Sequence, residues 1–158
     1  MAINVLIPQE LHDSHLGTGI GQVSGGVRRG EIWLLKKIRN LFGRGLSRRL
    51  TNALSRAIAP AFESVVERSL LRRGAVVRQV QVGGPNNRNT ADFLWNSLYI
   101  EVKSGRTISG REVQQLNAIT ETARAARTSF SYVFLEKPTQ DALDKITSRS
   151  GTAIWFFE

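Results

Sequence analysis

The spacing of apolar residues divides this chain into two parts. From residue 61 onward, short β-rich runs alternate with stretches whose apolar residues recur at helical intervals. Residues 1–30 instead carry six glycines among polar side chains, a pattern typical of turns and loosely packed chain. We therefore predict a folded domain over residues 59–158, preceded over residues 1–58 by a glycine-rich arm and a basic helical extension.

The folded part begins with a helix over residues 61–73, which Gly74 ends. Strands follow at 75–82, 91–95 and 98–103, with a loop at 83–89. Ser109 and Glu112 form a capping box that opens a helix to about residue 127. A strand at 131–135, a helix that Thr139 caps and Gly151 ends, and a strand at 152–157 complete an α/β order.

Residues 91–103 have the pattern of a β-hairpin with a two-residue turn at Asn96 and Ser97. A longer loop with shifted pairing remains an alternative. With the short turn, one face of the hairpin is entirely apolar, as a face directed at the core should be. The predicted pairs are Trp95 with Leu98, Leu94 with Tyr99, Phe93 with Ile100 and Asp92 with Glu101, and the apolar face comprises Ala91, Phe93, Trp95, Leu98, Ile100 and Val102.

The other face of the hairpin carries the candidate chemistry. Asp92 and Glu101 would oppose each other, and Lys103 lies two residues beyond Glu101 on the same face. Directly opposed carboxylates destabilise a sheet unless a cation compensates them. That cation can be Lys103 or a divalent ion bound by oxygen ligands. The alternative is a solvated strand face with an ordinary surface ion pair.

Composition and charge narrow the choice of ligands. The chain has 22 Lys and Arg against 13 Asp and Glu, a formal net charge of +9 that attracts polyanions such as nucleic acid. With no cysteine it can form neither a disulfide nor a thiolate zinc site, so any metal is bound through oxygen or imidazole. No apolar run is long enough to span a bilayer and the first residues lack a secretory signal, so we expect a soluble protein without stable membrane insertion.

Two short motifs resemble those of the PD-(D/E)XK nuclease superfamily. The segment TAD at 90–92 followed by IEVKSG at 100–105 resembles the superfamily's signature, although no proline precedes Asp92. In AFESVVERSLLRRG, Glu63 is followed by Leu70 and Gly74 at the spacing common in the superfamily's first helix. The resemblance covers residues 61–135 and implies a restriction-endonuclease-like core, αβββαβ, with a central mixed sheet flanked by helices.

The resemblance also implies roles for individual residues. Asp92, Glu101, Glu63 and the backbone carbonyl of Val102 would hold Mg²⁺ or Mn²⁺, with Zn²⁺ left open. Lys103 would orient the attacking water and offset charge on the phosphorane. Gln115, at the edge of a helix stripe, is a further catalytic candidate, and Glu67 is the rival helix carboxylate one turn after Glu63.

The basic residues extend this interpretation to nucleic acid. Residues 28–56 hold nine Lys or Arg against one acid, a stretch that could follow a nucleic-acid backbone, lie on an anionic membrane or present a solvated face. The arginines expected to contact phosphate are Arg72, Arg73, Arg78, Arg88, Arg106 and Arg111.

The predicted function is metal-dependent hydrolysis of phosphodiester bonds in DNA or RNA, tRNA included. Small size, basic charge and the glycine-rich arm resemble the nuclease toxin domains of bacterial contact-dependent or polymorphic toxin systems, which implies an acidic immunity protein and action in the cytoplasm of a target bacterium. A stand-alone repair or recombination nuclease, such as a Holliday-junction resolvase, is the close alternative. A non-catalytic basic module that binds nucleic acid or membrane is the other.

Other motifs are less specific. His12 and His15 flank Asp13, but their spacing without a regular element favours a polar arm over a metal site. The glycine-rich residues 17–26 follow no strand and lack the Gly-Lys-Ser/Thr of a phosphate loop. We expect Trp33, Trp95 and Trp155 to lie in the core.

Overall fold

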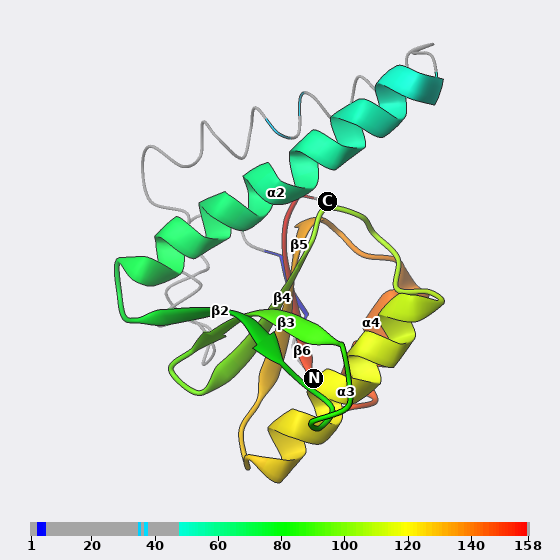
Figure 1. The fold of residues 1–158 in the computed structure, drawn as a ribbon. Coiled ribbons are helices and arrows are strands. Elements are labelled where there is room, and N and C mark those ends of the chain that lie inside the picture. Colours follow the sequence, from blue (N-terminus) through cyan, green and yellow to red (C-terminus); the bar gives the residue numbers. More distant parts are fainter. Residues whose placement is uncertain (1–2, 6–34, 36, 38–47, 158) are drawn as a thin grey trace.

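The computed structural model describes residues 3–5, 35, 37 and 48–157, and its centre is a mixed β-sheet (Figure 1). Strands β2 to β6 form this five-stranded sheet, and the short β1 adds to its edge beside β6, in the order β1-β6-β5-β4-β3-β2. The strands β2, β3 and β4 run antiparallel, whereas β4, β5 and β6 run parallel. The strand bounds are β1 Ile3–Val5, β2 Val76–Gln81, β3 Thr90–Trp95, β4 Leu98–Lys103, β5 Phe130–Glu136 and β6 Thr152–Phe157.

Helices cover both faces of the sheet. Helix α2 (Arg48–Leu71) crosses one face, and α3 (Arg111–Ala125) and α4 (Gln140–Thr147) lie on the other (Figure 1). Two buried clusters result, one beneath α2 around Phe62 and Leu70, the other beneath α3 and α4 around Leu116 and Trp155. The predicted order of helix, three strands, helix, strand, helix and strand is confirmed, as are the core positions of Trp95 and Trp155.

Helix α2 departs from its predicted bounds. It was expected to begin after Pro60, but it begins at Arg48 and runs through Pro60 to Leu71. A proline inside a helix costs about 3 kcal/mol, because it removes one backbone hydrogen bond and crowds the preceding turn. The buried stripe of Ile58, Phe62 and Val65 continues across it, so burial offsets that cost. The boundary drawn between residues 58 and 59 therefore lies within a helix.

The hairpin has the predicted register. Phe93 pairs with Ile100, Leu94 with Tyr99, and Trp95 with Leu98. Asn96 and Ser97 have φ values of 49° and 64°, the positive values that a two-residue type I′ turn requires at both positions. The short turn is confirmed, and the shifted alternative is wrong.

Because Ser97 has a positive φ, glycine should fit this turn better. We expect Ser97→Gly to raise the free energy of unfolding by about 0.5–1 kcal/mol, since it removes the left-handed strain of a residue with a Cβ. Urea denaturation measures the change. Ser148, at φ −62°, is the matched control, because Ser148→Gly relieves no such strain and should destabilise the protein. Equal destabilisation by both changes would contradict the prediction.

The predicted apolar face of the hairpin is only partly correct. Phe93, Trp95 and Ile100 pack beneath α2, but Ala91 packs in the cluster beneath α3. The alternation shifts at Asp92, because Gln79 and Asp92 are skipped in the β2–β3 ladder and Gln79 has φ 50°. Helices cover both faces, so the face that carries the candidate chemistry is also packed.

The last two helices begin close to where they were predicted. Thr139 caps α4 by accepting a hydrogen bond from Ala142 N, as expected. The capping box of α3 is incomplete, because Glu112 accepts from Ser109 N while Gly110 is the N-cap. The last turn of α4 ends at Thr147, before Gly151.

Close packing against the Phe130 ring requires a residue without a side chain at position 151, where the sequence has Gly151. A Cβ at Gly151 would collide with the Phe130 ring, which is buried. We expect Gly151→Ala to destabilise the protein by about 1–3 kcal/mol, the usual range for overpacking a filled core. Thermal and urea denaturation measure this change. Gly105→Ala is the control, since a Cβ there meets no atom within 4 Å. A neutral Gly151→Ala would contradict the packing argument.

Several predictions fall outside the described residues. They concern the glycine-rich arm, His12, His15 and Trp33, and most of the basic stretch at 28–56, of which residues 48–56 lie in α2. Among the described residues, no helix is both long and apolar enough to cross a membrane.

Candidate functional site

The candidate site is centred on Asp92, where the β3–β4 ladder stops. The ladder ends at the pair of Phe93 with Ile100, and the predicted pair of Asp92 with Glu101 is replaced by hydrogen bonds of their side chains. Asp92 Oδ2 accepts a hydrogen bond from Val102 N at 2.7 Å, and Asp92 N donates to Glu101 Oε2 at 3.3 Å. Each carboxylate thus accepts a hydrogen bond from the backbone of the strand that carries the other. Burial raises the pKa of Asp92, although the hydrogen bond from Val102 and the charge of Lys103 act to lower it.

Glu101 is the most deeply buried acid of the site. Its side chain is 4% exposed, so its negative charge has lost most of its hydration. Burial, and then repulsion from Asp92, raise the pKa of Glu101 to about 7 despite the opposing effect of Lys103. A cation that binds Glu101 would therefore stabilise the ionised form of its carboxyl group.

Lys103 is held by three side chains. Its Nζ lies 3.0 Å from Glu101 Oε1 and 3.3 Å from Glu112 Oε1, and it donates to Gln115 Oε1 at 3.4 Å. Burial acts to lower the pKa of Lys103, but Glu101 and Glu112 outweigh it and leave the pKa raised. The ammonium group is therefore charged and fixed in direction.

Gln115 connects α3 to the strands that carry the acids. Its Nε2 donates to the carbonyl of Thr90 at 2.7 Å while its Oε1 accepts from Lys103. The amide therefore bridges β3 and β4 at the site. The structure thus places this predicted residue in contact with the lysine.

Glu63 lies at the other side of the site, on α2. Its pKa is raised by burial and then by repulsion from Asp92, with Arg78 opposing. Arg78 lies 3.8 Å from Glu63 Oε1 and 3.2 Å from Glu67 Oε1, so both helix carboxylates share one arginine. Glu63 is within the electrostatic influence of Asp92 but is paired with Arg78.

The donor set suits a hard divalent ion. Among the described residues, no three acidic or histidine side chains lie close enough to hold an ion together, so the expected convergence of Asp92, Glu101 and Glu63 is not present. Mg²⁺, however, is commonly bound through one or two carboxylates, with waters and substrate phosphates completing its shell. Val102 N donates to Asp92 Oδ2, and the N–H and C=O of one strand residue point to the same side of the strand, so the Val102 carbonyl points toward β3. Asp92, Glu101 and this carbonyl are the residues that would hold the ion.

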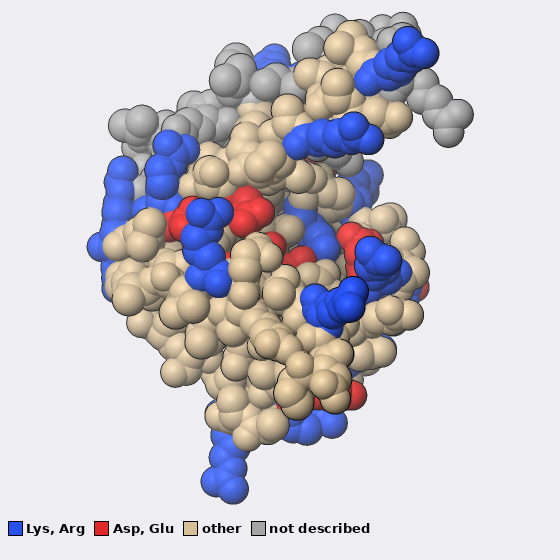
Figure 2. All heavy atoms as spheres, in the orientation of Figure 1, with Lys and Arg blue, Asp and Glu red and all other residues tan. Residues whose placement is uncertain are grey.

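The surface beneath α2 carries acidic side chains in a hollow, with basic residues at its rim (Figure 2). Figure 2 shows acidic atoms in the hollow beneath α2, with Lys and Arg side chains on both sides of it. The arginines that were predicted to contact phosphate are all exposed. Arg72 and Arg73 follow α2, Arg78 lies on β2, Arg88 lies in the β2–β3 loop, and Arg106 and Arg111 lie between β4 and the first turn of α3.

No family model, curated protein or solved structure matches this chain. The function is therefore inferred from the sequence motif and the geometry of the site.

Three residues of the site were missed in the sequence. Glu112 was assigned only to the cap of α3, yet it also contacts Lys103; its position three residues before Gln115 was the available signal. Gln79 Nε2 donates to Asp92 Oδ1 at 3.4 Å, which depends on a β2–β3 register that no motif indicates. Tyr132 pairs with Glu101 across β4 and β5, and its buried hydroxyl has no hydrogen-bond partner among the described residues.

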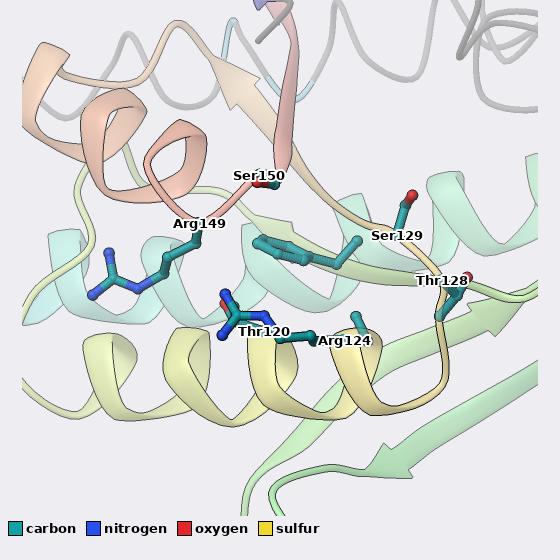
Figure 3. A pocket seen from close by; sticks show the side chains of 8 residues that line it. Thr120, Arg124, Thr128, Ser129, Arg149 and Ser150 are labelled. Atoms are coloured by element: carbon teal, nitrogen blue, oxygen red, sulfur yellow. The ribbon is translucent and has the colours of Figure 1, made fainter.

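A separate pocket, of about 150 Å³, lies where β5 begins (Figure 3). Arg124, Arg149 and the hydroxyl side chains of Thr120, Thr128, Ser129 and Ser150 line it around the Phe130 ring. The guanidinium group of Arg149 is already hydrogen-bonded within the protein, since it donates to Asn117 Oδ1 and to the Lys145 carbonyl. This pocket contains none of the site's carboxylates.

Proposed function

We propose that this protein is a metal-dependent nuclease of the PD-(D/E)XK type that hydrolyses phosphodiester bonds in DNA or RNA. The observation that carries the proposal is the coupling of Asp92, Glu101 and Lys103. The two carboxylates are hydrogen-bonded to each other's strand, and the lysine Nζ lies 3.0 Å from Glu101. An ordinary surface ion pair does not require a glutamate that is 4% exposed.

The arrangement of elements supports the same proposal. A helix, an antiparallel three-stranded unit, a second helix and a parallel strand follow in the order of a restriction-endonuclease-like core. The acids lie on the second and third of these strands, Glu63 lies on the first helix and Gln115 on the second. The five-stranded α/β sheet is common to many folds, so the site supports the proposal more strongly than the fold does.

In the proposed reaction, Asp92, Glu101 and the Val102 carbonyl would hold Mg²⁺ or Mn²⁺. The ion would offset the negative charge of the scissile phosphate and lower the pKa of the attacking water. Lys103, held by Glu112 and Gln115, orients that water and offsets the charge that develops on the phosphoryl oxygens. Glu63, which lies on α2 and pairs with Arg78, would complete the metal shell directly or through water.

The basic rim supports a polyanionic substrate. A net charge of +9 and exposed arginines on both sides of the hollow favour phosphate contacts that do not depend on sequence. Within this proposal we infer a toxin domain of a bacterial competition system, whose cognate immunity protein would be acidic and cover the same hollow. Such a toxin would act in the cytoplasm of the target cell.

Purified protein incubated with plasmid DNA and with total RNA tests the proposal. Cleavage of at least one substrate is expected with Mg²⁺ or Mn²⁺ and none with EDTA. Absence of cleavage in every metal would overturn the proposal, and cleavage that continues unchanged in Asp92→Ala and Lys103→Ala would overturn this assignment of the site.

A further inference from the structure

The loop between β2 and β3, residues 82–89, separates two polar hollows. One, of about 540 Å³, lies beside β2 and β3, and the other, of about 550 Å³, lies beside α3. Asn86, Asn87 and Arg88 line both hollows and so form the crest between them. We call the first the amide hollow; its polar lining consists of Gln79, Gln81, Asn86, Asn87, Arg88 and Thr90.

The loop is held in one shape by its own hydrogen bonds. Gln81 Nε2 lies within hydrogen-bonding distance of the carbonyls of Gly84, Pro85 and Asn87, at 3.2, 3.2 and 2.9 Å. Asn87 Oδ1 accepts from the backbone N and the side chain of Asn89, at 2.9 and 2.7 Å. Two of the amides therefore maintain the loop. Asn86 and Arg88 make no hydrogen bond or ion pair with the part of the chain that the structure describes.

The amide hollow and the candidate site share Gln79. This residue lines the hollow, donates to Asp92 Oδ1 at 3.4 Å and accepts from Thr90 Oγ1 at 3.2 Å. Its φ of 50° is a left-handed conformation that glutamine adopts only at a cost of about 1–2 kcal/mol. Strain of this kind is concentrated at functional sites, where the surrounding structure maintains it. A group bound in the amide hollow would therefore lie close to a group bound at Asp92.

The lining has the chemistry of base recognition rather than of phosphate recognition. None of the described residues that line the amide hollow is acidic, and Arg88 is its single cation. An amide presents a donor and an acceptor side by side, which matches the paired acceptor and donor on the edge of a base, best of all adenine. In nucleic acid, these edges are accessible mainly in unpaired strands, where bases can be turned outward.

We propose that the amide hollow binds an unpaired nucleobase, adenine by preference, beside the phosphodiester that is cut at Asp92. Asn86 contacts the edge of the base, and Arg88 contacts an adjacent phosphate. This proposal rests on the proposed nuclease function. It predicts that cleavage occurs at a fixed distance from a preferred base.

Sequencing the products from random single-stranded DNA and RNA, cleaved with Mn²⁺, tests this inference. The wild-type protein should show one enriched base at a fixed position from the cut, and Asn86→Ala should reduce that enrichment about fivefold or more. Arg88→Ala should weaken cleavage of all sequences by a similar factor and leave the preference unchanged. Arg124→Ala, which removes an equal charge at the pocket in Figure 3, is the matched control and should change neither.

A binding measurement in EDTA separates this inference from the nuclease proposal. Fluorescence anisotropy with short labelled homopolymers should show tighter binding of oligo(A), and Asn86→Ala should abolish the difference. Selective binding without any cleavage would overturn the nuclease proposal and support base binding in the amide hollow. Cleavage with no base preference, or a preference that Asn86→Ala retains, would overturn base binding in the amide hollow and leave the nuclease proposal intact.

Discussion

Replacing Asp92 with asparagine is expected to lower the rate of metal-dependent cleavage by roughly a thousandfold, since metal-ion stabilisation of the transition state contributes several kcal/mol. Asparagine keeps the size of the side chain and an oxygen that can accept from Val102 N, and it loses only the acceptor of the long, 3.4 Å hydrogen bond from Gln79 Nε2. What it removes is the negative charge that a divalent ion requires. The fold should therefore survive while metal binding and cleavage are lost.

Three measurements separate these effects for Asp92→Asn. Initial cleavage rates, calorimetric titration with Mn²⁺ and urea denaturation should show lost activity, weakened metal binding and unchanged or increased stability, because burial raises the pKa of the native carboxyl. Asp144→Asn, an equivalent change at an exposed position of α4, should leave all three unchanged. Cleavage by Asp92→Asn within about tenfold of wild type would contradict the assigned role, since tenfold corresponds to only about 1.4 kcal/mol.

The second large effect concerns the pH dependence of stability in the metal-free protein. The pKa of Glu101 is raised to about 7 in the folded state from an ordinary value of 4.5, first by burial and then by Asp92. A carboxyl group whose folded pKa is raised contributes stability that is fully present below pH 4.5 and is lost as the pH rises through about 7. Between about pH 5 and pH 8, wild type should lose on the order of 3 kcal/mol relative to Glu101→Gln.

Urea denaturation in EDTA across this pH range measures the difference. Glu101→Gln should have the flatter dependence, whereas Glu121→Gln, at an exposed position of α3, should follow wild type. Added Mg²⁺ should reduce the loss in wild type at the upper end of the range, because the ion binds the ionised carboxylate. Parallel curves for wild type and Glu101→Gln would show that Glu101 does not titrate in this range.

Local patterns predicted the hairpin and most of the elements. The two-residue turn at Asn96 and Ser97, together with strict alternation, was sufficient to pair Phe93 with Ile100. The same reasoning failed at Asp92, where the ladder opens and Ala91 turns to the other face. It also failed at Pro60, where packing against the sheet maintains a helix that local propensity would end.

The candidate site also combines contacts that local sequence patterns predict with contacts that depend on tertiary packing. Glu101 and Lys103 share a face because strand residues alternate, and this was evident from two positions in the sequence. The contact of Lys103 with Glu112 joins α3 to β4, and the contact of Gln79 with Asp92 joins two strands across a distorted ladder. Contacts of this kind depend on how separate elements pack, which no short motif specifies.

The sequence by itself determined the α/β order, the hairpin register and the Asp92, Glu101 and Lys103 set, because turn chemistry and alternation act between near neighbours. Only the tertiary structure decided the surroundings of that set: the burial of Glu101, the attachment of Lys103 to α3 and the pairing of Glu63 with Arg78. Burial and charge pairing arise when distant segments remove water from one another, and the pKa of Glu101 follows from that.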